Sequence, residues 1–337
     1  MAVLGNTFLN LLDVHRGTEP GAVLEILSQT AAIAQDAFIG EANRGTYHEH
    51  SIRTGLPSVA WGALYQGIPQ SKGHTQVVKD TTGFVEALSS IDERLLQIEP
   101  EKAGQVRLAE ASGFLEAMSQ EWESGVFYHD TATAPEKFKG LSARYNSTAN
   151  PNVVSAGGSG SDNTSVWFVT WGESFTSLIH PKGTPGGIVR EDKGSQRITD
   201  ASGNPYYVKE ELFRLHTGVS VGDWRYNARV CNIDVSDLAA GNVDIYRQLT
   251  KAYYRLQGRK VARPGNQIMG GKPAPRTVMY CNRNVLEALD VIATNKGASD
   301  NFVRLRPMEV EGQEVLTWRG IPIRETDALL NTEAAVS

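Results

Sequence analysis

The chain has 337 residues, of which 40% are hydrophobic and 21% charged, and its formal net charge is −5. A chain of this length forms one large domain or two to three smaller ones, each able to bury a core. The mildly acidic charge, without any Lys- and Arg-rich run, excludes a protein that grips nucleic acid tightly through its phosphates.

Residues 1–45 are expected to form an N-terminal leader. Within it, 7–14 favours a short helical turn, and apolar side chains between Val23 and Ala34 recur at helical intervals. The first residues lack a basic stretch and Asp13 interrupts their apolar run, so a signal peptide is not expected. No apolar segment approaches the roughly 20 residues that a membrane-spanning helix needs. We therefore expect a protein that stays in cytosol-like solvent.

Residues 46–90 are predicted to form two extended limbs joined by a turn at 66–74. Their glycines and prolines exclude a long helix. Limbs of a dozen residues would reach about 40 Å. A lone two-stranded hairpin is marginally stable in water. If this one projects, another surface must cover the apolar side chains near its turn, which are Trp61, Leu64, Tyr65 and Ile68.

Residues 91–128 are the clearest helical region, because apolar positions recur at intervals of three and four and Pro100 suits a helix start. From 84 to 137 the chain holds eleven acidic and four basic residues, whereas 46–83 holds two acidic and three basic ones. The two regions are mildly complementary in charge, although ordinary solvated helix faces explain the same pattern. The apolar stripe consists of Leu108, Ala111, Leu115, Met118 and Trp122.

The sequence that follows is rich in strand signals. Residues 165–171 and 175–180 are predicted to pair as a hairpin that turns at 172–174. The stretch 200–205, "DASGNP", is predicted to be a second hairpin turn. Further strands are expected at 196–199, 206–216 and 219–233.

The last third mixes helices and strands. Ser236 is a candidate cap for a helix with an apolar stripe from Leu238 to Leu256. A buried strand is expected at 277–282, followed by a helix that ends at Gly297. The chain is predicted to close with a hairpin made of 301–310, a turn at Glu311-Gly312, and 314–326.

No stretch has the spacing of a phosphate-binding loop. "PGNQIMGGKPA" has one residue too many between Gly265 and Gly271, and Pro273 stands where a magnesium-binding hydroxyl belongs. "AGGSGSDN" and "HPKGTPGG" lack the later glycine that such loops require. We therefore expect no nucleotide and no other cofactor, and Lys182 becomes a candidate contact with a neighbouring subunit.

No metal or catalytic centre is predicted. His48 and His50 lie on one side of an extended strand, which permits a metal, but a solvated or interface strand is the better interpretation. Cys231 and Cys281 have no metal-binding spacing and no recognisable His or Asp partner, so they are expected to be small buried side chains. The glutamates of the long helix are expected to form its solvated face.

Several stretches, taken in order, resemble one family. The chain resembles the major capsid proteins of tailed double-stranded DNA bacteriophages, which share the Hong Kong 97-type (HK-97-like) shell fold, and in particular those of the Epsilon15-type short-tailed phages. The resemblance covers nearly the whole chain. Its stretches are "IRTGLPSVAW" (52–61), "PEKFKGLSARY" (135–145), "GGSGSDNTSVWFVTWG" (157–172), "HPKG" (180–183), "NIDVSDL" (232–238), "MYCNR" (279–283) and "WRGIPIRETDALLNTE" (318–333).

The resemblance implies an α+β fold divided as in these capsid proteins. It implies an N-terminal arm at 1–45, an extended loop (E-loop) at 46–90, a peripheral domain with a spine helix at 91–135 plus 301–328, an axial domain at 136–300, and a C-terminal tail at 329–337. The closing "GIPIR" strand lies nearer the end of the chain than in many relatives, so the strand order of the axial domain is expected to be rearranged.

The resemblance also implies a function. The chain is expected to self-assemble as pentamers and hexamers into an icosahedral shell around double-stranded DNA, which it touches weakly and without specificity. It is expected to be a virion capsid protein, assembled in the host bacterial cytoplasm without a membrane, and no enzyme. Expected partners are other copies, a portal protein, a decoration protein and, because no long helical segment precedes the arm, a separate scaffolding protein.

The candidate intersubunit contacts come from the hairpin and from the loop after 175–180. They are Arg53, Trp61, Leu64, Tyr65, Lys72 and Lys182. Two other functions remain open at this point. A capsid decoration or adaptor protein would bind preformed shells and would lack the extended loop, and a soluble enzyme would need a concave site with convergent acids.

Overall fold

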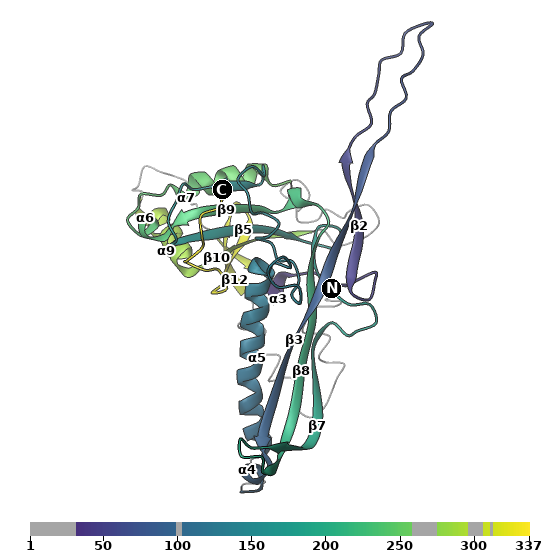
Figure 1. The fold of residues 1–337 in the computed structure, drawn as a ribbon. Helices are drawn as coiled ribbons and strands as arrows, with labels where there is room; N and C mark the ends of the chain where they lie inside the picture. The colour runs from purple at the N-terminus through teal and green to yellow at the C-terminus, as the bar shows by residue number, and fades with distance from the viewer. Residues whose placement is uncertain (1–31, 99–102, 258–274, 296–305, 311–312) are drawn as a thin grey trace.

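The computed structural model describes residues 32–98, 103–257, 275–295, 306–310 and 313–337. Figure 1 shows three parts: a long upright helix beside a narrow sheet of long strands, a lobe of shorter strands and helices, and a two-stranded arm that projects far beyond both. The predicted turn at 7–14, the cap at Gly297 and the turn at Glu311-Gly312 lie outside the described residues, as does Pro100.

The upright part combines one long helix with three long strands. The helix is α5 (Ala103–Tyr128), preceded by the short α4 (Glu93–Ile98). The strands are β3 (His74–Asp92), β8 (Pro205–Val221) and β7 (Gly187–Thr199), all antiparallel in the order β3-β8-β7. The expected strand at 196–199 is therefore the end of a much longer one, and the "DASGNP" turn joins β7 to β8 as predicted.

The helix packs one face against this sheet. The predicted stripe is confirmed, since Ala111, Leu115, Met118 and Trp122 are buried and Leu108 packs against the same core. Burial of each large apolar side chain contributes about 1.5–3 kcal/mol. The indole N–H of Trp122 donates to Thr217 Oγ1 of β8 across 3.3 Å, which satisfies the one polar atom that the ring carries into the core.

Alternation along β8 separates its two faces. Glu211, Phe213, Leu215 and Thr217 are buried, while the residues between them are half-exposed. On the outer face Phe84 and Leu88 of β3 stay exposed, and Arg214 pairs with Glu86 between them. Among the described residues, the upright sheet is thus covered on one side only.

The lobe is built around β5 (Asn163–Trp171), every residue of which is buried. Its neighbours are β9 (Ala228–Asp234) and β10 (Arg276–Cys281), both antiparallel to it. The helices α6 (Val235–Ala239), α7 (Ile245–Arg255) and α9 (Arg283–Asn295) pack on this sheet through a second apolar cluster that includes Phe168, Leu249 and Leu289. The remaining lobe strands are β4 (Val153–Ser155), β11 (Arg306–Val310), β12 (Gln313–Trp318) and β13 (Ile321–Glu325).

The predicted hairpin over 165–180 is wrong. The strand β6 (Thr176–His180) touches β5 at a single parallel pair, Trp171 with Thr176, and then runs between β8 and β1 (Ile39–Glu41). The reason is that β9 and β10 already occupy both edges of β5, so β6 must find partners elsewhere. The sequence showed two apolar runs and a turn, but not this competition for edges.

Three boundaries also differ from prediction. The strand expected at 219–233 is interrupted by a 3₁₀ turn, η3 (Trp224–Tyr226), which Asp223 caps. The expected helix from Ser236 is two helices, capped by Asp234 and Asp244 instead. The closing segment 314–326 folds back on itself at Arg319-Gly320, where both residues have positive φ, and so forms a second hairpin from β12 and β13.

Two sets of strand pairings join segments that the sequence analysis assigned to different domains. Within 301–328, expected in the peripheral part, β13 pairs in parallel with β10 and Trp318 packs in the lobe against Phe168. Conversely β7 and most of β8, expected in the axial part, line the upright sheet beside α5 (Figure 1). Apolar faces explain both placements, because Ile321 and Ile323 complete the lobe core while Phe213 and Leu215 face the helix.

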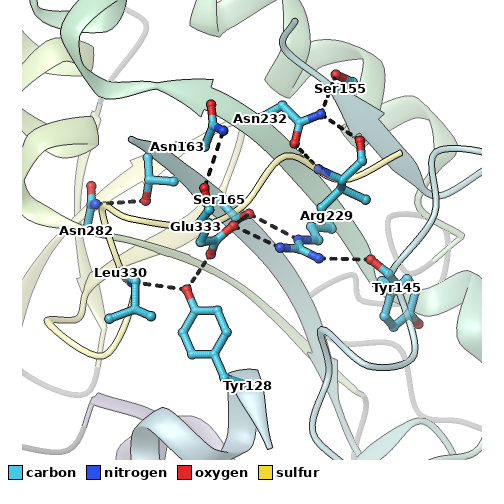
Figure 2. A network of polar contacts seen from close by, with 12 residues as sticks. Tyr128, Tyr145, Ser155, Asn163, Ser165, Arg229, Asn232, Asn282, Leu330 and Glu333 are labelled. Carbon is cyan, nitrogen blue, oxygen red and sulfur yellow. Dashed lines mark hydrogen bonds and ion pairs between the residues drawn. The ribbon is translucent and has the colours of Figure 1, made fainter. Parts of the chain in front are cut away.

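A buried ion pair joins the last residues of the chain to the lobe. Arg229 Nη2 lies 2.9 Å from Glu333 Oε2, and both side chains are about 5% exposed. Ser165 and Tyr128 donate to the same carboxylate (Figure 2). Arg229 also donates to the Tyr145 carbonyl at 3.0 Å and lies over the Trp167 ring. Five segments of the chain therefore meet at one ion pair whose polar atoms are hydrogen-bonded.

Further hydrogen bonds hold the chain on either side of Glu333. Asn163 O accepts from Glu333 N–H, and Asn232 pairs with both the N–H and the carbonyl of Val336. The segment from 329 onward, expected to be a C-terminal tail, is thus hydrogen-bonded to the lobe.

The first test concerns this pair. Glu333→Gln leaves the Arg229 guanidinium buried without its counter-charge, so we expect the free energy of unfolding to fall by about 3 kcal/mol. Chemical denaturation measures it. Arg225→Gln, which removes an exposed pair with Asp223, should change it by less than about 0.5 kcal/mol. Equal losses in both variants would contradict a special role for the buried pair.

A second buried carboxylate, Glu123 of α5, joins the helix to α3 (Ala32–Asp36) and to the C-terminal segment. Thr326 Oγ1 donates to it at 3.0 Å, and the N–H groups of Ala32 and Ile33 bond to it as well. Burial, aided by Asp327, raises the pKa of Glu123 to about 7 because those hydrogen bonds only partly offset desolvation.

The second test follows from this pKa. The folded protein binds the Glu123 proton more tightly than the unfolded chain does. The stability that this proton contributes is therefore fully present below about pH 4.5 and is lost as the pH rises to about 7. Glu123→Gln should remove this fall and raise the free energy of unfolding at pH 8, on the order of 2 kcal/mol. Denaturation across pH 4.5–8 measures it. Exposed Glu110→Gln is the control, and an unchanged slope in Glu123→Gln would refute the assignment.

Candidate assembly surface

The tip of the projecting arm carries the most exposed apolar side chains of the described chain. Residues 56–73 join β2 (Tyr47–Gly55) to β3 with no strand pairing. Trp61 and Tyr65 are 101% and 107% exposed relative to an extended reference. Four more apolar residues there are at least 79% exposed, namely Leu56, Val59, Leu64 and Ile68. Soluble monomers seldom expose so contiguous a patch, which marks it as an interaction surface.

A few local contacts shape this tip. Ser71 Oγ donates to the Ser58 carbonyl at 2.6 Å and ties the two limbs together. Gln66 N–H donates to the Ala63 carbonyl at 3.2 Å, closing a turn. Tyr65 within that turn has a φ of 68°, a left-handed conformation that costs a bulky residue about 1 kcal/mol or more. The turn thus holds the Tyr65 ring away from its own chain.

The root of the arm is fixed by a buried carboxylate. Asp80 of β3 is 2% exposed, and Arg144 Nη1 lies 2.7 Å from its Oδ1. Val221 N–H donates to Asp80 Oδ2 at 3.2 Å, and Arg144 donates to the Val219 carbonyl at 3.0 Å. The carboxylate therefore binds the arm to the end of β8 at the point where β3 leaves the upright sheet.

Two imidazoles stand beside this carboxylate. His50 Nε2 lies 3.1 Å from the Val221 carbonyl, and its Nδ1 is 3.7 Å from Asp80 Oδ2. The ring of His48 lies 5.9 Å from that of His50. Burial and then the neighbouring His50 lower the pKa of His48, which favours its neutral form. In the parts of the chain that the structure describes, no group of three or more His, Cys, Asp or Glu side chains is arranged to hold a metal ion.

A cavity of about 540 Å³ opens at this root, between β1, β2 and β6. Its floor is buried and includes Ile39, Ser177, Ile179 and Ser220. Its rim is exposed and carries two carboxylates, Glu41 and Glu173. Nearly half of its lining residues are glycine or serine, among them Gly40, Ser51, Ser174 and Gly222. Nothing in the sequence pattern marked this cavity, because its walls come from five separate segments.

The predicted contact residues fall into two places. Trp61, Leu64 and Tyr65 share the tip, while Arg53 and Lys72 are exposed on the two limbs below it. Lys182 is exposed on the body instead, in the turn after β6, where its N–H donates to the Arg44 carbonyl at 3.3 Å. The neighbouring Gly183 N–H donates to Glu41 on the cavity rim at 2.8 Å. The role of these six residues in subunit contacts stays a prediction.

The described residues show little that suits catalysis. Cys231 and Cys281 are buried free thiols, and burial raises the pKa of Cys281 to about 12, which suppresses its thiolate. The expected small, buried cysteines are confirmed.

Across the described ranges no helix is both long and apolar enough to cross a bilayer.

Comparison with known proteins gives one family. The family model "Major capsid protein GP7" matches residues 15–337. The solved structure of the bacteriophage Epsilon15 capsid is 28% identical, with a TM-score of 0.68, and the match covers 100% of this chain and 99% of that one. No curated protein matches the chain.

Other solved structures are more remote. The bacteriophage JBD30 capsid has a TM-score of 0.48 at 7% identity, with 94% of this chain and 96% of that one covered. An encapsulin complex from Synechococcus elongatus PCC 7942 has a TM-score of 0.40 at 11% identity, with coverage of 60% and 87%. These likenesses are too distant for comparison of residues.

The third test concerns the root of the arm. Asp80→Ala leaves Arg144 buried without its partner and frees Val221 N–H, so we expect the arm to loosen and the free energy of unfolding to fall by about 3 kcal/mol. Limited proteolysis should cut within 56–73 several times faster. Asp200→Ala, at the exposed β7–β8 turn, is the control. Unchanged cleavage at the arm in Asp80→Ala would show that the carboxylate does not hold it.

Proposed function

The chain belongs to the major capsid protein GP7 family and has the Hong Kong 97-type capsid fold of mixed helices and strands, and from this premise we propose how it assembles. It forms pentamers and hexamers that close into an icosahedral shell around double-stranded DNA. The observation that carries the proposal is the arm, which ends in fully exposed Trp61 and Tyr65. Such a tip needs another surface, and other copies of a shell protein provide one.

The arm acts as the extended loop and lies across a neighbouring subunit. One copy offers its tip and receives a tip elsewhere on its body, so the contact is heterologous and closes into a ring when the rotation allows. The rigid root at Asp80 supports this role, because it sets the direction of the arm before any neighbour is bound. Preorganisation of this kind lowers the entropy lost on association.

The remaining domain roles follow the family with two adjustments. We assign 46–90 to the extended loop and α5 to the spine helix of the peripheral domain. The pairings of β7 and β8 with β3 favour placing them beside that helix. The pairing of β13 with β10 favours placing the closing strands in the axial domain. Residues 1–45 would serve as the N-terminal arm.

The net charge of the chain bears on how the shell contacts packaged DNA. A net charge of −5 favours weak, non-specific contact with packaged DNA, so that the DNA slides along the inner surface of the shell instead of binding tightly.

The protein acts without catalysis, in the virion capsid, after assembly in the host bacterial cytoplasm. A separate scaffolding protein guides the assembly, a portal protein interrupts the shell, and a decoration protein can bind it from outside. Membership in a major capsid family makes a decoration protein or an enzyme the weaker interpretation of the chain itself.

The fourth test removes the anchors. Trp61→Ala with Tyr65→Ala deletes two rings that are fully exposed in the described part of the chain, so we expect unchanged thermal stability and at least tenfold less assembled material. Sedimentation and negative-stain microscopy of the purified protein measure capsomers and shells. Tyr207→Ala, which removes an exposed ring of β8 outside the arm, is the control.

Two results would count against the proposal. A wild-type chain that stays monomeric even when the other phage head proteins are supplied would refute shell formation. Normal shells from the double variant would refute anchoring by the tip. Uniform closed shells from the chain alone would remove only the need for a scaffolding protein.

A further inference from the structure

The exposed tip alone does not identify the surface that receives the arm. The cavity at the root of the arm is a concave candidate on the described body. The root cavity has a volume of about 540 Å³. It is larger than one tryptophan or one tyrosine side chain. The residues of its floor are buried, while Glu173 and Ser174 at its mouth are exposed. A hole of this kind, lined with glycines and serines, leaves space for a bulky side chain from another molecule.

We infer that the hairpin tip of one copy, led by Trp61, inserts into the root cavity of the next copy. This inference rests on the proposed function and names the acceptor for the same arm. The knob lies at one end of the arm and the hole at the other. One chain therefore cannot easily fill its own cavity, and the contact runs head to tail from copy to copy.

Charge favours this pairing. The stretch 51–77 that forms the tip and its flanks carries Arg53 and Lys72 and no acidic residue. The cavity rim carries the carboxylates of Glu41 and Glu173. A basic arm therefore meets an acidic rim, which steers the encounter and disfavours the reversed orientation.

Apolar contact favours an aromatic knob. Phe38, Ile39 and Ile179 line the cavity, and Ile39 and Ile179 are buried. The ring of Trp61 or of Tyr65 is large enough to cover these apolar walls.

A cysteine pair tests the contact directly. Gly62→Cys places a thiol beside the knob, where a Cβ meets nothing within 4 Å, and Ser174→Cys places one on the exposed rim. The native Cys231 and Cys281 are buried and do not compete. We expect mild oxidation of assembled protein to give a ladder of disulfide-linked oligomers on non-reducing gels, at least tenfold more than in Gly62→Cys with Ser202→Cys, whose second thiol lies at the β7–β8 turn.

Blocking the hole is the second arm of the test. Ser174→Trp closes the mouth at an exposed position, so the monomer should melt as the wild type does while assembly falls at least tenfold. Ser202→Trp should assemble normally. No ladder from either small oligomers or shells of the cysteine pair, or full assembly of Ser174→Trp, would overturn the inference. If shells still form in that case, the proposed function stands and only the acceptor is wrong.

Discussion

The continuity of β3 is the constraint on which the rest of the molecule depends. One half of this 19-residue strand pairs with β8 in the upright sheet, and the other half pairs with β2 in the arm. A single strand cannot bend freely between two ladders, so the arm leaves the body in a direction that the upright sheet dictates. Asp80 stands at the changeover and ties it to Arg144 and Val221. The position of the tip is therefore set by hydrogen bonds far from it.

Buried charges play the same part elsewhere in the body. Arg229 with Glu333 joins the C-terminal segment to the lobe, and Asp36 receives Arg276 and Arg324 where α3 meets β10 and β13. A buried pair adds little net stability over apolar residues, but it is costly to break on one side. Such pairs favour a single arrangement of distant segments. A shell subunit needs this, because small errors in one copy are repeated around every ring.

The arm itself has the opposite character. Its outer half has no core, and a hairpin with only two strands is marginal in water. Its apolar side chains are exposed without any gain for the monomer, and they bring a risk of aggregation. Such exposure is favourable only if association with another molecule buries these side chains. At the root of the arm, the charged groups Asp80 and Arg144 are buried and paired, whereas at its tip the apolar side chains are exposed. This contrast separates the chain from a self-contained globular protein.

The sequence by itself determined the features that depend on neighbours along the chain. Gly and Pro spacing excluded helix over 46–90, a period of three and four set the buried face of α5, and continuous apolar runs marked β5 and β10. The order of its stretches also revealed the capsid family. Only the tertiary structure decided that β6 leaves β5 for β8, that β13 joins the lobe, and that five segments enclose a cavity. Periodicity encodes which side of an element is buried, whereas the choice of partner depends on which strand edges the rest of the chain has already filled.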